Sequence, residues 1–562
     1  MKLLNSGTNI HSLAYFLVLV LLAMSIPLSK YAMSVSQFAL LGLWIWAGFS
    51  FQISFRFFKL TGFFGGLRHF FVYLFRLAVD NLVEKFSLFF RNKAALVFVS
   101  IYLIHVVGLL YSQNIDYALK DLRVKLPLLM LPVVLSTMEP LSFRRFRVLM
   151  FFYLAAVFSG TLIGAGLLIT GNYVDIRQIS PFISPIRFGL NVSFGFFALI
   201  YFAFHDNKSR IWQRVLFTGV AIWFVVFLFL LESVTGIAVV VSGVVGYLIW
   251  LLLKTRFKWL RLALIVSMIA LPLVLVFEVW RTVVDATTPP DINFAELDQY
   301  TRSGNLYDHD TTNNQIEDGR YVGLYICTKE LQEAWNKRSS IDYYGKTEAC
   351  YPVDATLIRY LTSKDLRKDA DGVNALTEWD IRTIEQGTAN VHYITSPGLR
   401  VRILKMLKGY DVYQKTGNPS GSSMMQRIEY VRASLGIIQK NLICGVGTGD
   451  LDDAFNQQYE DMNTPLEVQY RYHAHNQFLG IAVALGLIGL CWFIFALIYP
   501  GIKTKAFSDY FYSVFFMMVV ISMFSDDTIE TQAGATLFAF FLSLLLFGRK
   551  RDGNIWRPPG QE

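Results

Sequence analysis

The sequence predicts an all-α polytopic membrane protein with about twelve transmembrane helices and one large, mainly helical external loop before the tenth. The first observation is composition: 54% of the 562 residues are hydrophobic and only 17% are charged, which excludes an ordinary soluble protein. The second is that apolar runs long enough to cross a hydrocarbon core of about 30 Å recur along the chain. The third is one long polar block, residues 280–472, which must lie in water.

Twelve apolar segments are the candidate spans. The fourth is short and contains Pro127 and Pro132, so on its own it would indicate an interfacial or half-crossing segment. The twelve segments are approximately 12–29, 33–54, 95–111, 126–138, 147–169, 187–204, 214–231, 236–253, 261–279, 476–499, 508–524 and 531–547.

The distribution of Lys and Arg decides in favour of twelve spans. With a cytoplasmic N-terminus, six clusters of Lys and Arg then all fall on the cytoplasmic side, as the positive-inside rule requires, whereas dropping the fourth span breaks the alternation. The net charge of +9 is therefore mostly topology, and no nucleic-acid partner is expected. The clusters are 56–93, 143–147, 207–214, 254–261, 503–505 and 548–551.

This topology divides the chain into four parts. They are an N-terminal bundle of about nine spans (1–279), an external cap (280–475), the C-terminal transmembrane helices (476–547) and a cytoplasmic tail (548–562). The short turns 170–186, 232–235 and 525–531 share the external side with the cap. The cytoplasmic segment near 62–93 is aromatic but interrupted by charges. Its stretch from Gly62 to Arg91 is predicted to be an amphipathic helix on the inner surface. No cleavage pattern follows the first span, which we expect to remain as an anchor.

The external block has the periodicity of a folded, mainly helical domain. Residues 321–335, 355–368 and 425–442 show helical spacing of apolar residues. "TGNPSGSS" (416–423) is a loop by composition, and "GVGTGD" (445–450) is a glycine turn closing the last helix. Cys327 and Cys350 share this block, so a disulfide between them is possible chemically but not decided by the sequence.

Two histidines stand at the start of the tenth span, in "RYHAHNQFLGIAVALGLIGLCWFIF" (471–495). His475 lies at the external boundary of the membrane. An imidazole there can take a proton from a hydroxyl group near neutral pH, which no nearby Ser, Asn or Gln can do. From position alone, an interfacial histidine bonded to backbone is the commoner alternative.

The residues that follow favour the catalytic interpretation. His475-Asn476, nine further residues and then Gly486 and Gly489 resemble the signature of the bacterial O-antigen ligases and their relatives, the O-antigen polymerases and protein O-oligosaccharyltransferases. Segment 426–450, an Arg-led helix with a glycine turn, and segment 522–545 also resemble this family. The resemblance is strong in the C-terminal third and weak over 290–400.

The resemblance implies a multi-pass protein of the Gram-negative inner membrane with its active site facing the periplasm. Members of this family transfer a glycan from an undecaprenyl-diphosphate-linked donor to an acceptor, without a nucleotide sugar, a cofactor or a metal. Such a transfer needs a base for the acceptor's proton and cations for the departing phosphate charge. His475 matches the base, and arginine suits the phosphate because its planar fork donates two hydrogen bonds.

Three arginines are candidates for binding the diphosphate. Arg427 heads the helix before the glycine turn and matches a family position. Arg187, in "SPIRFGLN", stands at the outer mouth of the sixth span, where an arginine usually has an anionic partner. Arg471 adjoins the histidines, although an arginine at the edge of a span is more often an anchor. Many ligases carry a Ser-Arg-Gly-like turn before the large loop, whereas this chain has Glu-Ser-Val-Thr-Gly at 232–236.

Other residues near the signature have supporting interpretations. His473 lies outside the signature and is a possible auxiliary base. Asn476 could orient the imidazole, bind a sugar hydroxyl or cap the tenth helix. Gly486 and Gly489 are expected to let that helix approach a neighbour closely. His105, within the third span, is expected to be bonded to a neighbouring helix.

Two further motifs are weaker. "GVGTGD" could cradle a phosphate, but helix termination explains it. "DLDD" (450–453) is similar to the metal-binding acids of nucleotide-sugar glycosyltransferases, but on the external side we expect a solvated acidic turn.

The predicted function is therefore an O-antigen ligase-like, metal-independent glycosyltransferase acting on a lipid A core sugar among membrane lipids. An O-antigen polymerase, with a glycan acceptor, or a protein O-oligosaccharyltransferase remains open, because the sequence shows no acceptor site. A polysaccharide transporter or flippase is an alternative of another class, but such folds usually consist of repeated halves with charges near the midplane.

Overall fold

The computed structural model describes residues 4–47, 51–170, 176–206, 209–255, 257–289, 291–313, 315–395 and 398–550. The chain forms two compact units: unit 1 comprises 1–247 and 425–562, and unit 2 comprises 248–424. Most of the predicted cytoplasmic tail, from residue 551, lies outside the described residues.

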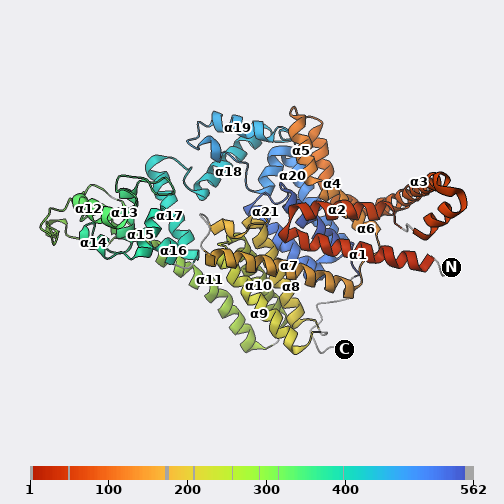
Figure 1. Ribbon diagram of the computed structural model, residues 1–562, viewed down its shortest axis with the longest axis horizontal. Helices are drawn as coiled ribbons and strands as arrows, with labels where there is room; N and C mark the ends of the chain where they lie inside the picture. Colours follow the sequence, from red (N-terminus) through yellow and green to blue (C-terminus); the bar gives the residue numbers. More distant parts are fainter. Residues whose placement is uncertain are drawn as a thin grey trace. The chain divides into compact units, whose positions relative to one another are not determined.

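Unit 1 is a bundle of helices whose buried residues form one continuous apolar core. Each of the twelve predicted spans coincides with a helix, and eleven of these helices lie within or begin in this unit. Figure 1 shows the helices in chain order by colour. Its helices are α1 (Leu4–Leu28), α2 (Lys30–Ile45), α3 (Phe51–Arg91), α4 (Lys93–Leu109), α5 (Ile115–Lys125), α6 (Pro127–Thr137), α7 (Phe143–Thr170), η1 (Ile176–Ile179), α8 (Pro185–Phe204), α9 (Ile211–Leu230), α10 (Val234–Lys254, which ends in unit 2), α18 (Ser423–Lys440), α19 (Leu451–Asp461), η3 (Val468–Tyr470), α20 (Gln477–Lys503), η4 (Ala506–Ser508), α21 (Tyr510–Ser525) and α22 (Gln532–Leu546).

The chain is an all-α polytopic membrane protein, as predicted. Among the described residues, seven helices are long and apolar enough to cross a membrane: α1, α7, α8, α9, α10, α11 and α20. The bent pair α3 and α4 gives an eighth candidate. The remaining predicted spans, α2, α6, α21 and α22, are shorter helices of 16, 11, 16 and 15 residues.

The second predicted span and the amphipathic segment have different bounds from those expected. The second helix ends at Ile45 rather than near residue 54, and α3 begins at Phe51 rather than near residue 62. Asn81 and Lys85 of α3 donate hydrogen bonds to carbonyl groups at the end of α2, which fixes this junction. α3 then turns into α4 with a bend of 97°.

The exposed surface of α3 carries an apolar stripe beside charged residues such as Arg76 and Asp80. Phe71, Phe75, Val79 and Val83 recur every four residues and are all exposed, so they form one stripe along the helix. This pattern is the reverse of a soluble helix, which turns its apolar face inward. It agrees with the predicted contact between α3 and lipid.

α20 is broken in its middle, at the first of the two signature glycines. Gly486 has φ +65°, and a Cβ there would lie 2.1 Å from the carbonyl oxygen of Ile443. A Cβ at Gly489 would meet Leu485 of its own helix at 2.2 Å rather than a neighbouring helix. Gly486 therefore permits a break in α20 and the close approach of the segment after α18.

The segment after α18 fills this break. Val446 and Gly447 donate to the carbonyl groups of Val483 and Ala484, at 3.0 and 2.8 Å, and Leu487 donates to the carbonyl of Leu442 at 2.9 Å. These bonds satisfy backbone groups that an interrupted helix would otherwise leave unpaired. The "GVGTGD" turn thus stabilises the break in α20 in addition to ending α18.

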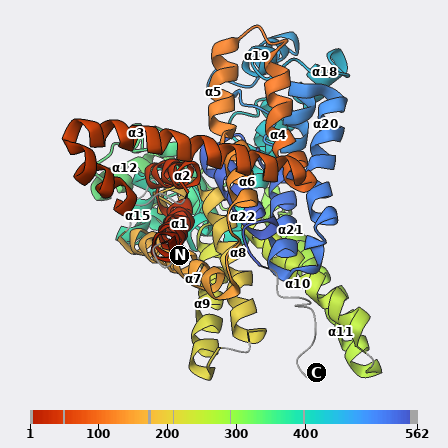
Figure 2. The ribbon, with the colours of Figure 1, turned by 90° about the vertical axis from the view of Figure 1, so that its right-hand side faces the viewer.

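α4 and α20 lie side by side, and α5, α18 and α19 gather at one end of this pair (Figure 2). Contacts within unit 1 join helix ends that the predicted alternation assigns to the same side. Arg187 of α8 and the 525–531 turn, both predicted external, are in contact. Arg147 pairs with Asp206, and Arg549 with Asp509, among ends predicted to be cytoplasmic.

Unit 2 is a smaller, mainly helical unit with its own core. α11 continues to Thr287, eight residues into the block that was predicted to begin at residue 280. Residues 321–327 were predicted to be helical, but they are not, because Ile326 pairs with Asp308 and Lys368 in extended bridges. The elements are α11 (Lys258–Thr287), η2 (Phe294–Glu296), β1 (Ile316–Glu317), β2 (Arg320–Tyr321), α12 (Thr328–Arg338), α13 (Val353–Ser363), α14 (Ala370–Asn374), α15 (Glu378–Glu385), α16 (His392–Thr395) and α17 (Gly398–Thr416).

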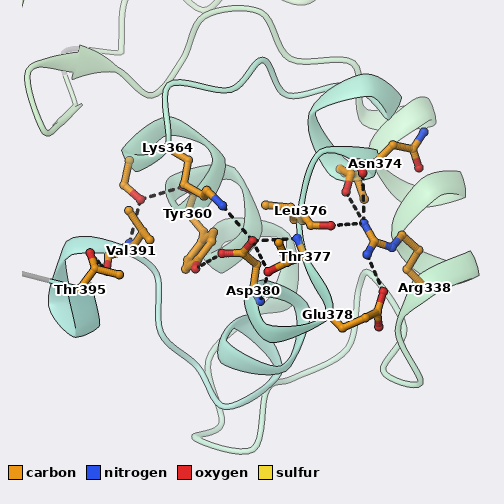
Figure 3. Close-up of polar contacts among 12 residues, drawn as sticks. Arg338, Tyr360, Lys364, Asn374, Leu376, Thr377, Glu378, Asp380, Val391 and Thr395 are labelled. Atoms are coloured by element: carbon orange, nitrogen blue, oxygen red, sulfur yellow. Dashed lines mark hydrogen bonds and ion pairs between the residues drawn. The ribbon is translucent and has the colours of Figure 1, made fainter.

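The core of unit 2 is held by aromatic packing and by a buried carboxylate. Trp335 and Tyr360 are fully buried among the apolar residues of α12 to α15. Asp380 accepts hydrogen bonds from Tyr360 at 2.6 Å and from Lys364 at 2.8 Å (Figure 3). Cys327 is buried, Cys350 is exposed, and both thiols are free, so the structure contains no disulfide between them.

Candidate active site

The turn between α21 and α22, residues 525–531, forms the centre of a polar site in unit 1. Asp526 is 2% exposed and follows α21 directly. The Nδ1 atom of His475 lies 3.5 Å from Asp526 Oδ1 and 3.9 Å from Asp527 Oδ1. Arg187 Nη1 lies 2.8 Å from Asp526 Oδ2, and Nη2 lies 3.6 Å from Asp527 Oδ1. One imidazole, two carboxyl groups and one guanidinium therefore meet here.

The local backbone presents His475 to this turn. His475 has φ +45°, a left-handed conformation that is rare for a residue with a Cβ and is often found at functional sites. The next residue, Asn476, caps α20 by accepting a hydrogen bond from Leu479 N at 3.0 Å, and it donates to the carbonyl of Phe524 at 3.0 Å. Asn476 thus connects the histidine segment to the end of α21.

Aromatic rings enclose the imidazole on other sides. The rings of Tyr430 and Tyr472 lie 5.4 and 6.0 Å from the His475 ring, between centroids. Tyr430 is itself fixed, because its hydroxyl donates to the carbonyl of Tyr470 at 2.8 Å. The His475 side chain keeps 32% of its surface exposed, so a substrate hydroxyl can reach it.

The two acids differ in their electrostatics. Burial disfavours the charged form of Asp526, but its interactions with His475 and Arg187 outweigh burial and hold the pKa of this carboxyl below its usual range. For Asp527, burial and then the negative charge of Asp526 raise the pKa to about 6. Asp526 is therefore the permanent carboxylate of the site, and Asp527 titrates in the mildly acidic range.

This arrangement suits a proton acceptor. The Nδ1 atom of His475 faces the ionised Asp526, and within the described residues the Nε2 atom has no hydrogen-bond partner. A carboxylate on one side of an imidazole stabilises the imidazolium that forms when the other nitrogen takes a proton.

The same atoms have the spacing of a cation site. His475, Asp526 and Asp527 each offer a ligand atom, and these atoms lie within 4.8 Å of one another. Arg187 already contacts both carboxyl groups, so a metal ion would have to compete with its guanidinium.

Residues 389–494 match the family model described as O-antigen ligase. The resemblance to the O-antigen ligase family is confirmed over this segment. The matched residues include His475, Arg427 and both signature glycines, and end before the 525–531 turn. No curated protein matches the chain in a sequence comparison. The match and the apolar helices together support a multi-pass membrane protein with a glycosyl-transferring function.

Of the four residues predicted to bind the substrate, two lie at this site and two lie elsewhere. Arg187 and Asn476 reach it, as described above. Arg427 is exposed on α18, three residues before Tyr430, and has no ion pair within the described part of the chain. Arg471 donates to the carbonyl of Leu466 at 3.3 Å and lies over the ring of Tyr459, so it holds its own loop.

His473 points to a different partner from His475. Its Nε2 atom lies 2.5 Å from Asp452 Oδ1, and its ring stacks on Phe455 at 5.1 Å. These contacts tie His473 to α19. His105 donates from Nδ1 to the carbonyl of Ile101 in its own helix at 2.8 Å, not to a neighbouring helix as expected.

The "DLDD" segment is not a solvated acidic turn, contrary to the sequence prediction. Asp450 accepts hydrogen bonds from the backbone N–H groups of Gln113 and Asn114 at 2.9 and 2.8 Å, and Asp452 pairs with His473. Asp453 accepts from the Asn114 side chain at 3.2 Å. Asp450 and Asp453 therefore connect α19 to the loop before α5, and Asp452 connects it to the segment before α20.

The acids of the site were not among the residues predicted from the sequence. Asp526, Asp527 and Glu530 lie in a seven-residue turn between two apolar helices, and that density of acids was the available signal. The 232–236 segment does not contain the arginine that the family resemblance led us to expect there. In this segment, Thr235 Oγ1 lies 3.0 Å from Ser525 Oγ. That segment supplies a hydroxyl to the neighbourhood of the site.

Proposed function

We propose that the protein is an O-antigen ligase-like glycosyltransferase of the Gram-negative inner membrane. It moves a glycan from an undecaprenyl diphosphate carrier to a lipid A core sugar on the periplasmic side. The observation that carries this proposal is His475, within the family match and at the start of α20, with Nδ1 beside the buried Asp526 and Nε2 without a partner among the described residues.

The reaction follows from these positions. The acceptor hydroxyl attacks the anomeric carbon, the bond from that carbon to the phosphate oxygen breaks, and the hydroxyl proton passes to His475 Nε2. Asp526 stabilises the resulting imidazolium through Nδ1. The lipid diphosphate leaves with the electron pair of the broken bond, so negative charge grows on its oxygens.

Two arginines stabilise the leaving group in this proposal. Arg427 is exposed and unpaired within the described residues, so its guanidinium is available to phosphate. Arg187 is held by two carboxyl groups, and its charge acts on the diphosphate from this fixed position. The arginines supply the positive charge, so the transfer runs without a metal ion or cofactor.

The topology is part of the same proposal. The site includes the start of α8, the start of α20 and the 525–531 turn, all of which the positive-inside rule assigns to the periplasm. The cap, residues 280–475, which follows the N-terminal bundle in the sequence, then belongs to the periplasmic side. Most of residues 290–400 lies outside the family match, and this part of the cap is a candidate for selecting the acceptor.

The acceptor distinguishes this function from its alternatives. An O-antigen polymerase would extend a glycan, and a protein O-oligosaccharyltransferase would modify a protein hydroxyl, with the same donor chemistry. A transporter or flippase would move the carrier without breaking its anomeric bond. The family match supports transfer of the glycosyl group instead.

The test follows the fate of a labelled glycan. The full-length protein in proteoliposomes is given labelled undecaprenyl-diphosphate glycan with lipid A core, free glycan or a protein acceptor, with and without EDTA. Label on lipid A core, at equal rates with and without chelator, supports the ligase. Label only on longer glycan or on protein replaces it with the corresponding alternative, and intact carrier that has merely crossed the bilayer overturns glycosyl transfer altogether.

A further inference from the structure

A second polar cluster lies behind the 525–531 turn and has no role in the chemistry described so far. Lys125, the last residue of α5, is 2% exposed. Its Nζ atom lies 2.5 Å from Glu530 Oε2 and 2.5 Å from Asp121 Oδ1. A buried ammonium of this kind requires charged partners, because the bare charge would be strongly unfavourable away from water.

Gln477 connects this cluster to the segment that carries His475. Its side chain is fully buried, donates to Glu530 Oε1 at 2.9 Å and accepts from the backbone N–H of Ile529 at 2.9 Å. Gln477 is two residues after His475, and Glu530 is four residues after Asp526. The amide nitrogen and the amide oxygen of Gln477 therefore both bind the 525–531 turn, and they join it to the segment that carries His475.

The turn is consequently fixed on both sides of its acids. Asn476 holds the carbonyl of Phe524 before Asp526, and Gln477 holds Ile529 and Glu530 after it. Burial opposes the ionisation of Glu530, but the charge of Lys125 and the bond from Gln477 outweigh it and lower the pKa of Glu530 to about 2. Glu530 remains a carboxylate at neutral pH and stays bound to Lys125.

We propose that Lys125 is a positioning residue, which acts through Glu530 and Gln477 to hold the 525–531 turn so that Asp526 stays beside His475. This proposal rests on the proposed function for its kinetic consequence. The position of the turn itself can be measured without catalysis.

A matched control exists at the other end of the same two helices. Asp509 precedes α21, Arg549 follows α22, and the two form a buried ion pair with side chains 4% and 1% exposed. Asp509→Asn removes this ion pair but keeps an oxygen that can cap α21, where Asp509 accepts from Tyr512 N at 3.0 Å. It is placed at the end of the hairpin away from the 525–531 turn.

The test compares Lys125→Met, Lys125→Arg, Glu530→Gln and Asp509→Asn in the full-length protein. Amide hydrogen exchange of the 525–531 peptide reports the turn, and kcat and the KM for donor are measured per folded protein. We expect faster exchange in Lys125→Met and Glu530→Gln, with kcat at least tenfold lower and KM within threefold. Lys125→Arg should recover most of kcat, and Asp509→Asn should leave both the turn and kcat within twofold of the wild type.

Wild-type exchange of the turn in both Lys125→Met and Glu530→Gln would overturn the proposal, as would an equal loss of kcat in Asp509→Asn. If the wild-type protein transfers no glycan, the proposed function fails, while the exchange measurement still decides whether Lys125 holds the turn.

Discussion

The two ends of the α21–α22 hairpin are built alike but balanced differently. At one end, Asp509 and Arg549 form a buried pair of one acid and one base. At the other, four carboxyl groups, Asp121, Asp526, Asp527 and Glu530, share the two cations Arg187 and Lys125.

The unequal end also contains His475, whose buried Nδ1 has no hydrogen-bond partner. Balanced pairs stabilise a hairpin, whereas an excess of buried acid beside an imidazole is costly and is typically retained for chemistry. The difference indicates that the 525–531 end serves the reaction and the 509–549 end serves the fold.

The two ends should differ most when the equivalent acid at each end is neutralised. Asp526→Asn removes the carboxylate beside His475 and should lower kcat by about 10²- to 10⁴-fold, because the imidazolium loses its stabilising charge. Asp509→Asn should lower the melting temperature and leave kcat per folded protein within twofold. Both are measured with labelled donor and purified protein, and equal kinetic losses would show that the two ends do not differ in function.

Arg187 tests whether the cation at the unequal end acts on the substrate or only on the acids. Arg187→Ala should lower kcat by about 10²- to 10³-fold, as expected for losing a group that stabilises transition-state charge. Arg187→Lys keeps the charge and should lose about tenfold less than the alanine variant. Steady-state kinetics with the lipid-linked donor measures both, and equal losses would assign Arg187 a geometric role.

Asp527 should make the stability of the 525–531 end depend on pH. Its folded-state pKa of about 6 lies above its ordinary value of 3.8, so between these values the native state keeps a proton that the unfolded chain has lost. The contribution of Asp527 to stability therefore falls as pH rises through this window. Asp527→Asn stays neutral, so it should raise the melting temperature by a few degrees at pH 7.5 and by less at pH 5. No gain at pH 7.5 would contradict the raised pKa.

The smallest effect is expected at His473. It pairs with Asp452 on α19 rather than with the acids of the turn, so His473→Ala should change kcat by less than about threefold, the scale of a partly exposed pair. A loss as large as that of Asp526→Asn would make His473 a second member of the proton path.

The fold was largely predictable because apolar runs and basic clusters are local signals. All twelve segments are helices, but the ends of α2 and α3 were misplaced, since Asn81 and Lys85 bind α2 from more than thirty residues away. The break at Gly486 was also missed. It depends on the backbone of residues 442–447, which the spacing of two glycines does not reveal.

The site was predictable only in part. His475 could be found because its spacing to Gly486 and Gly489 is a sequence pattern. Its partners could not, because Asp526 is 51 positions away and Arg187 is more than three hundred positions from the turn. Lys125, at the end of a helix beside apolar residues, has the pattern of a membrane anchor, and only its contact with Glu530 shows otherwise.

Chemical rescue can show whether His475 takes the proton of the acceptor. His475→Ala is assayed in single-turnover transfer from the lipid-linked donor, with imidazoles of different basicity added to the medium. We predict negligible transfer without additive, unchanged donor binding, and a rescued rate that rises with the basicity of the added imidazole. Transfer at the wild-type rate without any imidazole would contradict this prediction.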